Sequence, residues 1–300
     1  MTQGSSFRTL LKKKAVILLP GTFNALVAKL IEAKGFDAVY CTGAGISTSL
    51  LGLPDIGLLS LHEMTRMVGY ICSAVKLPVI SDADTGFGNA INVMRTVWEF
   101  EKVGAAGIHI EDQVAPKRCG HVAGKEILPV EEMVGKIRAA VKARTDPDFT
   151  IIARTDARSV EGMTKAIERA ARYRDAGADM IFPEALETEG EFSEFARAVP
   201  GIPLMANMTE FGRTPYLSLE EFKRMGYRVV VFPVSTLRIA MKAVEEFLTG
   251  LKNSGTQKDF IGRMQTRKEL YDLIRYPQFT AWENEFLPEG GIDPLSKGPT

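Results

Sequence analysis

The sequence is poor in cysteine and histidine, carries no net charge and has no long apolar run. Its three cysteines form no CxxC pair and leave an odd number, which argues against a disulfide framework and fits a reducing cytoplasm. The 37 basic residues balance 37 acidic ones, so no overall field attracts nucleic acid or an anionic membrane. No segment reaches the ~18 apolar residues of a membrane-spanning helix. We therefore expect a cytoplasmic protein without nucleic-acid or membrane partners, in which local charges capture any anionic ligand.

Two motifs are absent near the N-terminus. The three lysines at positions 12–14 precede the apolar run Ala15 to Leu19, but Pro20 and Gly21 end this run too early for a signal peptide. No GxGxxG motif follows the run, which argues against the dinucleotide-binding form of an open doubly wound sheet. The run is therefore interpreted as a first buried strand.

The sequence contains a regular alternation of short β-rich apolar runs and longer segments with helical spacing, which is typical of parallel βαβ units. The predicted strands are Ala15 to Leu19, Ala38 to Thr42, Val79 to Asp82, Gly107 to Glu111, Thr150 to Thr155, Met180 to Phe182, Pro203 to Asn207 and Val229 to Pro233. Predicted helices include Ile91 to Val103, Glu131 to Arg144, Met163 to Ala176 and Ser235 to Thr249. Eight such strands most simply close into an α/β fold of the (β/α)8 TIM-barrel type; a doubly wound open sheet is the alternative.

The C-terminal part contains additional helical sequence. An amphipathic segment, Lys258 to Arg275, precedes a polar tail that contains proline and glycine, and this pattern predicts one more helix and a frayed end. A chain of this length could hold two medium domains, but the residues after Gly250 are interpreted as one more helix and a frayed end and not as a second domain. We expect residues 1–300 to form a single barrel domain with a helical extension from about residue 250.

Polar residues stand at the C-terminal ends of nearly all the predicted strands. They are Tyr40 and Cys41, Asp82 and Asp84, His109 and Glu111, Arg154 and Asp156, Glu184 and Asn207. Any one of them could be a loop cap or a buried salt bridge. Active sites of barrels are built at these strand ends, so their recurrence favours a functional site there.

The segment Ser81 to Gly88, SDADTGFG, is typical of a metal site. Residues i and i+2 of a strand face the same side, so Asp82 and Asp84 can both point toward one ion. Two adjacent carboxylates repel each other unless a cation or proton lies between them, and oxygen ligands favour Mg²⁺ or Mn²⁺. Glu111, and Glu184 with it, could hold water in the outer shell. The alternative is that the aspartates cap the following helix.

The segment Lys117 to His121, KRCGH, places a thiol between cations and an imidazole in a glycine-rich loop. This environment predicts that Cys119 is more reactive than a buried structural cysteine. Gly120 and Gly124 would let the loop act as a lid that carries an acid–base group into a closed site. A basic surface turn with an incidental cysteine is the alternative.

Ordered motifs through nearly the whole chain give it a resemblance to the isocitrate lyase and phosphoenolpyruvate mutase superfamily, and within it to the methylisocitrate lyases. These motifs are GLPDIG (Gly52 to Gly57), DADTGFG (Asp82 to Gly88), AAGIHIEDQ (Ala105 to Gln113), KRCGH (Lys117 to His121), IARTDA (Ile152 to Ala157), FPEA (Phe182 to Ala185) and NMTEFG (Asn207 to Gly212). The resemblance implies a (β/α)8 barrel whose last helix is exchanged between subunits, in a homotetramer.

The resemblance also assigns roles by position. It places Asp82 and Asp84 at the metal, with Asp55 and Glu111 nearby, and Cys119 at the catalytic cysteine, with Lys117 and His121 beside it. It places substrate contacts at Thr42, Gly43, Ala44, Gly120, Arg154, Glu184, Asn207, Thr209 and Arg238. Tyr40 is our candidate for the group that takes the substrate's hydroxyl proton.

The implied reaction is the Mg²⁺-dependent retro-Claisen cleavage of a small tricarboxylate, 2-methylisocitrate, to pyruvate and succinate, a step of the methylcitrate cycle in propionate catabolism. Cys119 would protonate the departing carbanion. Isocitrate differs by one methyl group, which a pocket discriminates by only ~1–3 kcal/mol, so isocitrate lyase or dual activity is the first alternative. The loop sequence Val122 to Lys125 resembles isocitrate lyases and favours it. Phosphonomutases, dimethylmalate lyases and oxaloacetate decarboxylases of the same superfamily are further alternatives.

Overall fold

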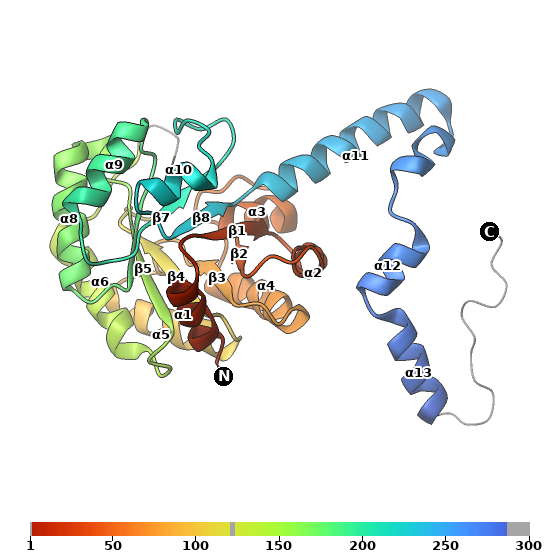
Figure 1. Cartoon of the computed structure of the whole chain (residues 1–300), viewed down its shortest axis with the longest axis horizontal. Helices are drawn as coiled ribbons and strands as arrows, with labels where there is room; N and C mark the ends of the chain where they lie inside the picture. Colours follow the sequence, from red (N-terminus) through yellow and green to blue (C-terminus); the bar gives the residue numbers. More distant parts are fainter. Residues whose placement is uncertain (1, 121–123, 287–300) are drawn as a thin grey trace. The chain divides into compact units, whose positions relative to one another are not determined.

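The computed structural model describes residues 2–120 and 124–286. All eight predicted strands are present and pair in parallel in the order β6-β5-β4-β3-β2-β1-β8-β7 (Figure 1). Their bounds are β1 Ile17–Thr22, β2 Val39–Cys41, β3 Val79–Asp82, β4 Gly107–Glu111, β5 Thr150–Thr155, β6 Met180–Pro183, β7 Met205–Asn207 and β8 Val229–Phe232. An isolated parallel bridge between Ile181 and Leu204 joins the two ends of this order. The predicted (β/α)8 barrel is confirmed, and the open sheet is excluded.

Helices cover the outside of the strands (Figure 1). Those of the barrel are α1 Gln3–Lys13, α2 Ala25–Ala33, α3 Gly43–Ile46, α4 Leu61–Ala74, α5 Ala90–Lys102, α6 Val130–Ala143, α7 Arg158–Glu161, α8 Met163–Asp175, α9 Glu189–Ala198 and α10 Leu219–Arg224, with a π-helical turn at Ser47–Leu51. The helices predicted at 91–103, 131–144 and 163–176 lie within one residue of α5, α6 and α8. Their apolar spacing therefore located them well.

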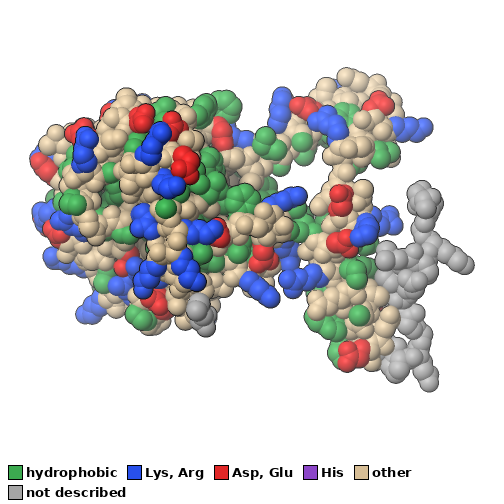
Figure 2. All heavy atoms as spheres, in the orientation of Figure 1, with side chains coloured by type: hydrophobic (Ala, Val, Ile, Leu, Met, Phe, Trp, Pro, Cys, Tyr) green, Lys and Arg blue, Asp and Glu red, His purple; other side chains and the backbone are tan. Residues whose placement is uncertain are grey.

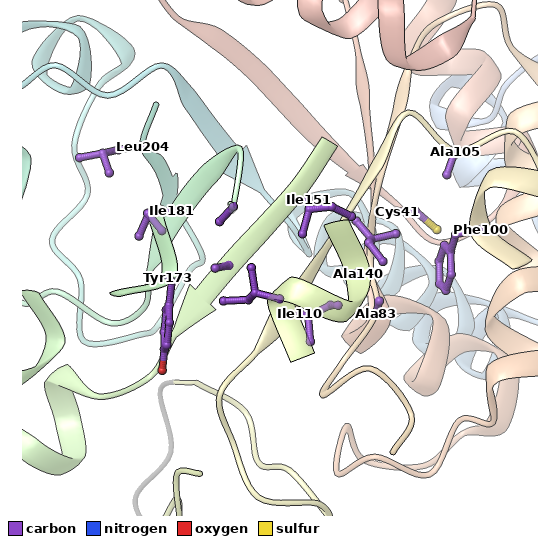
Figure 3. Close-up of a cluster of buried hydrophobic side chains, with 14 of the residues drawn as sticks. Cys41, Ala83, Phe100, Ala105, Ile110, Ala140, Ile151, Tyr173, Ile181 and Leu204 are labelled. Carbon is purple, nitrogen blue, oxygen red and sulfur yellow. The ribbon is translucent and has the colours of Figure 1, made fainter. Parts of the chain in front are cut away.

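Strand alternation divides the core into two layers. Outward side chains such as Ile110 and Ile151 pack against helix residues such as Phe100 and Tyr173 (Figure 3). Inward side chains, including Ile80 and Ile152, fill the barrel interior. Successive residues of a strand face opposite sides of the sheet. The residue two positions after an inward side chain therefore also points inward, closer to the C-terminal end of the barrel.

The opposite end of the barrel interior is closed by α1, which the sequence pattern did not identify. Thr2 caps this helix by accepting a hydrogen bond from the Ser5 amide at 3.1 Å. Phe7 is fully buried among inward strand residues, and Leu10 and Leu11 pack beside it. The helix therefore fills the N-terminal end of the barrel with apolar side chains and leaves the polar strand ends at the other end.

The chain separates into two compact units, with the boundary between Ile239 and Ala240. Helix α11 Ser235–Ser254 crosses this boundary, and a 3-10 helix Lys258–Arg263, α12 Arg267–Leu273 and α13 Tyr276–Phe286 follow. The predicted extension from about residue 250 falls in the second unit, and the single-domain prediction stays a prediction.

The prediction of one helix over Lys258 to Arg275 is wrong. The 3-10 helix ends before Met264, and a new helix starts at a capping box in which Thr266 and Glu269 satisfy each other's backbone amides. Such a box fixes a helix start, so it interrupts the apolar periodicity that suggested a continuous helix. The tail expected to fray also contributes α13.

In residues 2–120 and 124–286, no helix has the length and apolarity needed to cross a lipid bilayer. On the face of the molecule that Figure 2 shows, basic and acidic side chains are interspersed, in keeping with the balanced charge of the sequence. This face therefore offers no extended surface of one charge sign to a polyanion.

Candidate active site

A cavity opens at the C-terminal ends of the strands, and most of the predicted site residues line it. Those that line it are Tyr40, Thr42, Ala44, Asp55, Asp82, Lys117, Cys119, Gly120, Arg154, Glu184, Asn207, Thr209 and Arg238. Asp82, Arg154 and Asn207 each stand two residues after an apolar inward side chain of the same strand. The alternation that packs the interior thus also aims these polar groups into the cavity.

The predicted residues that do not line the cavity lie beside it or outside the described part. Asp84 and Glu111 are buried and are not among the residues that line the cavity. The backbone of Gly43 lies against Asp82, where an added Cβ would come within 2.6 Å of the carboxylate Oδ2. Only glycine allows this approach. His121 lies outside the described residues.

Asp82, Asp84 and Glu111 form a buried acidic cluster. Asp82 accepts a hydrogen bond from the Asp84 amide at 2.9 Å. Burial raises the pKa of Asp84 to about 6, although the Lys117 ammonium opposes this rise. Burial also raises the pKa of Glu111 well above its usual value, against the opposing effect of Arg154. For Asp82, burial is outweighed by His109, Lys117 and Arg154, which lower its pKa.

Lys117 stands as a cation within this cluster. Its Nζ lies 2.6 Å from Asp55 Oδ1 and 2.9 Å from Asp84 Oδ1, with a side chain only 4% exposed. Burial alone would lower the pKa of Lys117, but the surrounding carboxylates, Asp84 first, raise it well above its usual value. The lysine therefore keeps its proton and ties its loop to the acidic cluster.

The acidic cluster suits a hard divalent cation. Among the described residues, Glu111 Oε1 is buried and has no hydrogen-bond partner, and Asp84 holds a raised pKa that a nearby cation would lower. Within residues 2–120 and 124–286, no three His, Cys, Asp or Glu side chains form a complete metal cage. Mg²⁺ commonly uses one or two carboxylates and keeps waters or substrate oxygens as its other ligands, so the donors present fit this ion.

Tyr40 and His109 form a buried pair at the floor of the cavity. Tyr40 Oη lies 2.7 Å from His109 Nε2, and His109 Nε2 lies 3.5 Å from Asp82 Oδ1. Burial and the nearby Asp82 raise the pKa of Tyr40 well above 10, and burial lowers the pKa of His109 to about 4. Both groups are therefore neutral near pH 7, and a proton can be shared between them.

Arg154 connects the acidic residues on the other side of the cavity. Its Nε lies 2.9 Å from Asp156 Oδ2 and 3.2 Å from Glu111 Oε2, and its Nη1 lies 3.6 Å from Glu184 Oε2. Asn207 Nδ2 donates to Glu184 Oε1 at 3.1 Å. Burial would lower the pKa of Arg154, but Asp156 and the other carboxylates raise it well above its usual value. The cavity therefore holds a permanent, fixed cation.

Thr209 and Arg238 complete the rim. Thr209 is buried, whereas the Arg238 side chain is 48% exposed and lies 3.4 Å from Glu210. The Arg238 guanidinium also stacks over the Phe211 ring at 5.2 Å. Arg238 thus presents its charge from the edge of the cavity, while Arg154 presents its charge from the interior.

The described parts of the segment that carries Cys119, 113–120 and 124–128, are here called the cysteine loop. The two sides of its base pair with each other, since Val114 donates to Glu126 and Leu128 donates to Asp112, both at 2.8 Å. Cys119 is exposed and lines the cavity. Gly120 is packed so tightly that an added Cβ would lie 2.5 Å from both Arg154 and Glu184. The loop backbone therefore rests directly on the charged strand ends.

Sequence reasoning missed several residues at this site. Phe182, Val231, Pro233 and Val234 form its apolar wall. Lys125, 2% exposed at its side chain, donates to Asp156 across 31 positions of sequence. Inward strand alternation could have identified Phe182 and Val231. The Lys125 contact depends on the conformation of the loop, and a loop conformation has no periodic signal in the sequence.

The chain is similar to known proteins over most of its length. The profile of the family described as phosphoenolpyruvate phosphomutase matches residues 7–252. The 2-methylisocitrate lyase of Aeropyrum pernix is 53% identical over 92% of this chain and 88% of its own length. The 2,3-dimethylmalate lyase of Eubacterium barkeri is 47% identical over 95% of this chain and 99% of its own length.

A solved structure shares both the fold and the extent of the chain. The crystal structure of a 2,3-dimethylmalate lyase, described as a PEP mutase/isocitrate lyase superfamily member, superimposes with a TM-score of 0.90 at 36% identity. It covers 98% of this chain, which in turn covers 99% of it. Profile, sequence identity and fold thus point the same way, and the chain belongs to the phosphoenolpyruvate phosphomutase family of the PEP mutase/isocitrate lyase superfamily.

Proposed function

We propose that this protein is a 2-methylisocitrate lyase, which cleaves its substrate to pyruvate and succinate in the methylcitrate cycle of propionate catabolism. The observation that carries the proposal is the cavity in which Cys119, Arg154 and the Asp82 cluster converge. Curated relatives of that name are 44% to 53% identical over most of the chain and support the assignment. The activity is that of a carbon–carbon lyase.

The acidic cluster is proposed to hold Mg²⁺, with Mn²⁺ as the alternative, through Asp82 and Asp84 with Asp55 and Glu111 around them. When bound, the ion would supply positive charge that stabilises the oxyanion formed when the substrate hydroxyl loses its proton. Asp82 is already placed by its hydrogen bond from the Asp84 amide. Asp82→Ala should therefore weaken Mg²⁺ binding, which calorimetric titration of the purified variant measures.

The substrate carboxylates are proposed to bind at the two arginines. Arg154 is buried and held by Asp156 and Glu111, so its guanidinium is oriented before the ligand enters. Arg238 reaches the same cavity from the rim. Thr42, Gly43, Ala44, Gly120, Glu184, Asn207 and Thr209 are proposed as the other substrate contacts.

Tyr40 is proposed to receive the proton of the substrate's tertiary hydroxyl. Its phenol is neutral in the free protein, so it can accept a proton at Oη only as it passes its own proton to His109 Nε2, 2.7 Å away. Asp82 Oδ1, 3.5 Å from His109 Nε2, would stabilise the resulting imidazolium. The carbon–oxygen bond then becomes the ketone of pyruvate as the carbon–carbon electron pair leaves.

Cys119 is proposed as the acid that ends the reaction. The electron pair of the broken carbon–carbon bond stays on the substrate carbon next to a carboxylate, which makes it a carboxylate-stabilised carbanion. The Cys119 thiol transfers its proton to that carbon to give succinate. The thiolate then regains a proton from the His109 and Tyr40 pair or from solvent. Lys117 and His121 flank the thiol in sequence, and Lys117 anchors it through Asp55 and Asp84.

A homotetramer with an exchanged last barrel helix is proposed for the assembly. Helix α11 buries only Leu237 among its described residues, while Met241, Val244 and Leu248 continue the same helical stripe and are exposed. An apolar stripe of this spacing is typical of a helix that packs on a partner. Light scattering of the purified protein should give the mass of four chains. A cytoplasmic location is proposed from the three free cysteines.

The function is tested by product analysis. Purified protein with Mg²⁺ is given 2-methylisocitrate, isocitrate, 2,3-dimethylmalate or phosphonopyruvate, and pyruvate, glyoxylate and succinate are quantified. We expect equal amounts of pyruvate and succinate from 2-methylisocitrate. Turnover of phosphonopyruvate without carbon–carbon cleavage would assign the protein to the phosphonomutases instead.

Two alternatives within the lyases are separated by the same assay. A 2,3-dimethylmalate lyase is favoured by the 47% identical relative. Cleavage of 2,3-dimethylmalate would release pyruvate without succinate, so the product pair distinguishes it from 2-methylisocitrate cleavage. Isocitrate cleavage would release glyoxylate, and the ratio of the two specificity constants measures how well the apolar wall recognises the methyl group.

A further inference from the structure

A lysine outside the assigned site residues joins the two sides of the cysteine loop to the barrel. Lys125 Nζ donates to the Gly120 carbonyl at 2.5 Å and to Asp156 Oδ1 at 2.7 Å. Its side chain is only 2% exposed, so both contacts are shielded from water. A single ammonium thus bridges the residue after Cys119 to the end of strand β5.

The acceptor of this bridge is itself rigidly held. Asp156 is fully buried, accepts from Arg154 Nε at 2.9 Å, and its amide donates to Asp112 Oδ1 at 2.8 Å. Burial would raise the pKa of Asp156, but Arg154 and Lys125 outweigh it and lower this pKa. The carboxylate is therefore charged, and Lys125 meets a fixed anion instead of a flexible surface group.

Four other contacts, two hydrogen bonds and two ion pairs, hold the loop on the N-terminal side of the thiol. Gln113 exchanges hydrogen bonds with the Arg118 backbone at 2.9 Å, and Lys117 pairs with Asp55 and Asp84. All of these lie before Cys119 in the sequence. Among the described residues, Lys125 provides the hydrogen bond that holds the backbone immediately after Cys119, by donating to the Gly120 carbonyl.

We propose that Lys125 is a positioning residue that latches the cysteine loop onto Asp156 and so holds Cys119 against the ligand cavity. The inference rests on the proposed role of Cys119 as the acid. Lys125 touches neither the cavity nor the reacting atoms, and it acts through the backbone of Gly120. Its loss should therefore slow proton delivery while substrate contacts from Arg154 and Asn207 persist.

The test is the variant Lys125→Met, which keeps the length of the side chain and removes both hydrogen bonds. Hydrogen–deuterium exchange measured by mass spectrometry should show the amides of residues 114–120 exchanging on the order of 10-fold faster, as expected for loss of charged hydrogen bonds. The kcat for cleavage should fall by a similar factor of about 10-fold or more, with a smaller change in KM. Lys125→Arg, which retains donors and charge, should recover part of both losses.

Lys136→Met is the matched control. Lys136 is also a buried lysine bonded to a carbonyl, that of Thr85 at 3.0 Å, but it lies on α6, outside the loop. This variant should lower thermal stability without accelerating exchange at residues 114–120. Thermal melting of both variants verifies that they fold.

Unchanged exchange at residues 114–120 in folded Lys125→Met would overturn the latch, whatever the activity. A KM increase as large as the kcat decrease would also overturn it, because the lysine would then act in substrate binding. If the unaltered protein cleaves no hydroxy acid, the proposed function fails, while the exchange measurement still decides whether Lys125 holds the loop.

Discussion

The two ends of the barrel interior are built from the same inward strand positions and differ in what holds them together. At the N-terminal end, Phe7 packs on Ile17 and other apolar inward side chains. At the C-terminal end, Asp82, Arg154 and Glu111 occupy the same phase and are buried to a similar extent. Burial stabilises the first end, whereas at the second end the burial of charge is costly and is offset only by paired groups.

Stability and chemistry therefore depend on opposite ends of the strands. Three buried carboxylates with raised pKa values, Asp84, Glu111 and Asp112, lie at the C-terminal end. A site that keeps charges desolvated interacts strongly with a cation or an anionic ligand, because no water competes. We therefore expect changes at the two ends to separate activity from stability.

The largest expected effect is on turnover at the charged end. Cys119→Ser replaces the thiol by a much weaker acid, and kcat should fall by about 1000-fold, the scale of a lost general acid. Cys119 is exposed, so the melting temperature should not change. Steady-state kinetics and thermal melting measure both. Near-normal turnover would refute the proposed acid.

At the apolar end, a substitution should lower stability and leave turnover unchanged. Phe7→Ala removes a fully buried ring between α1 and the strands, which should lower the free energy of unfolding by about 3–5 kcal/mol. Turnover of the folded fraction should stay unchanged, because Phe7 does not itself line the cavity. Urea denaturation and active-site titration give the two quantities. A drop in kcat at unchanged stability would mean that the ends are coupled.

Gly120→Ala changes only the packing at the charged end and leaves every charged group in place. Its Cβ would lie 2.5 Å from Arg154 and Glu184, so the loop must move away from the strand ends. A displacement of this kind should reduce kcat roughly 100-fold. Gly124→Ala is a poorer control, since Gly124 has a positive φ of 80°. Gly135→Ala, with nothing near the added methyl, is the better one and should retain full activity.

The smallest effect is a pH dependence of cation binding. Asp84 has a pKa of about 6 in the ligand-free protein, and only its deprotonated form binds Mg²⁺. The affinity should be constant above this pKa and decrease by up to about 10-fold per pH unit below it. Calorimetric titrations at pH 7.5, 6 and 5 measure this trend. A constant affinity down to pH 5 would show that Asp84 does not titrate with the ion.

Local sequence signals predicted the parts of the fold that depend on local periodicity. Strands β3, β4 and β5 have the predicted bounds, because each is a compact apolar run ended by a polar residue. The missed helix α1 carries Phe7, Leu10 and Leu11 at helical spacing after the cap Thr2, a signal that could have been used. The broken helix after Lys258 likewise contains the capping pair Thr266 and Glu269.

The site was predictable as a set of residues and not as a set of contacts. Strand ends and the family resemblance located Asp82, Arg154 and Cys119, whose catalytic roles stay predictions. The pairing of Lys117 with Asp55 and Asp84 depends on how the cysteine loop folds back over the strands. Such contacts are set by loop conformation and side-chain rotamers, and neither of these produces a periodic pattern in the sequence.

The closure of the barrel has a consequence for ligand recognition. Strands β6 and β7 meet through one isolated bridge, between Ile181 and Leu204, and just above it the side chains of Glu184 and Asn207 are hydrogen-bonded to each other. The two residues proposed to bind the substrate thus also link β6 and β7, the strands between which the barrel closes. A ligand that binds Glu184 and Asn207 would therefore contact both of the strands between which the barrel closes.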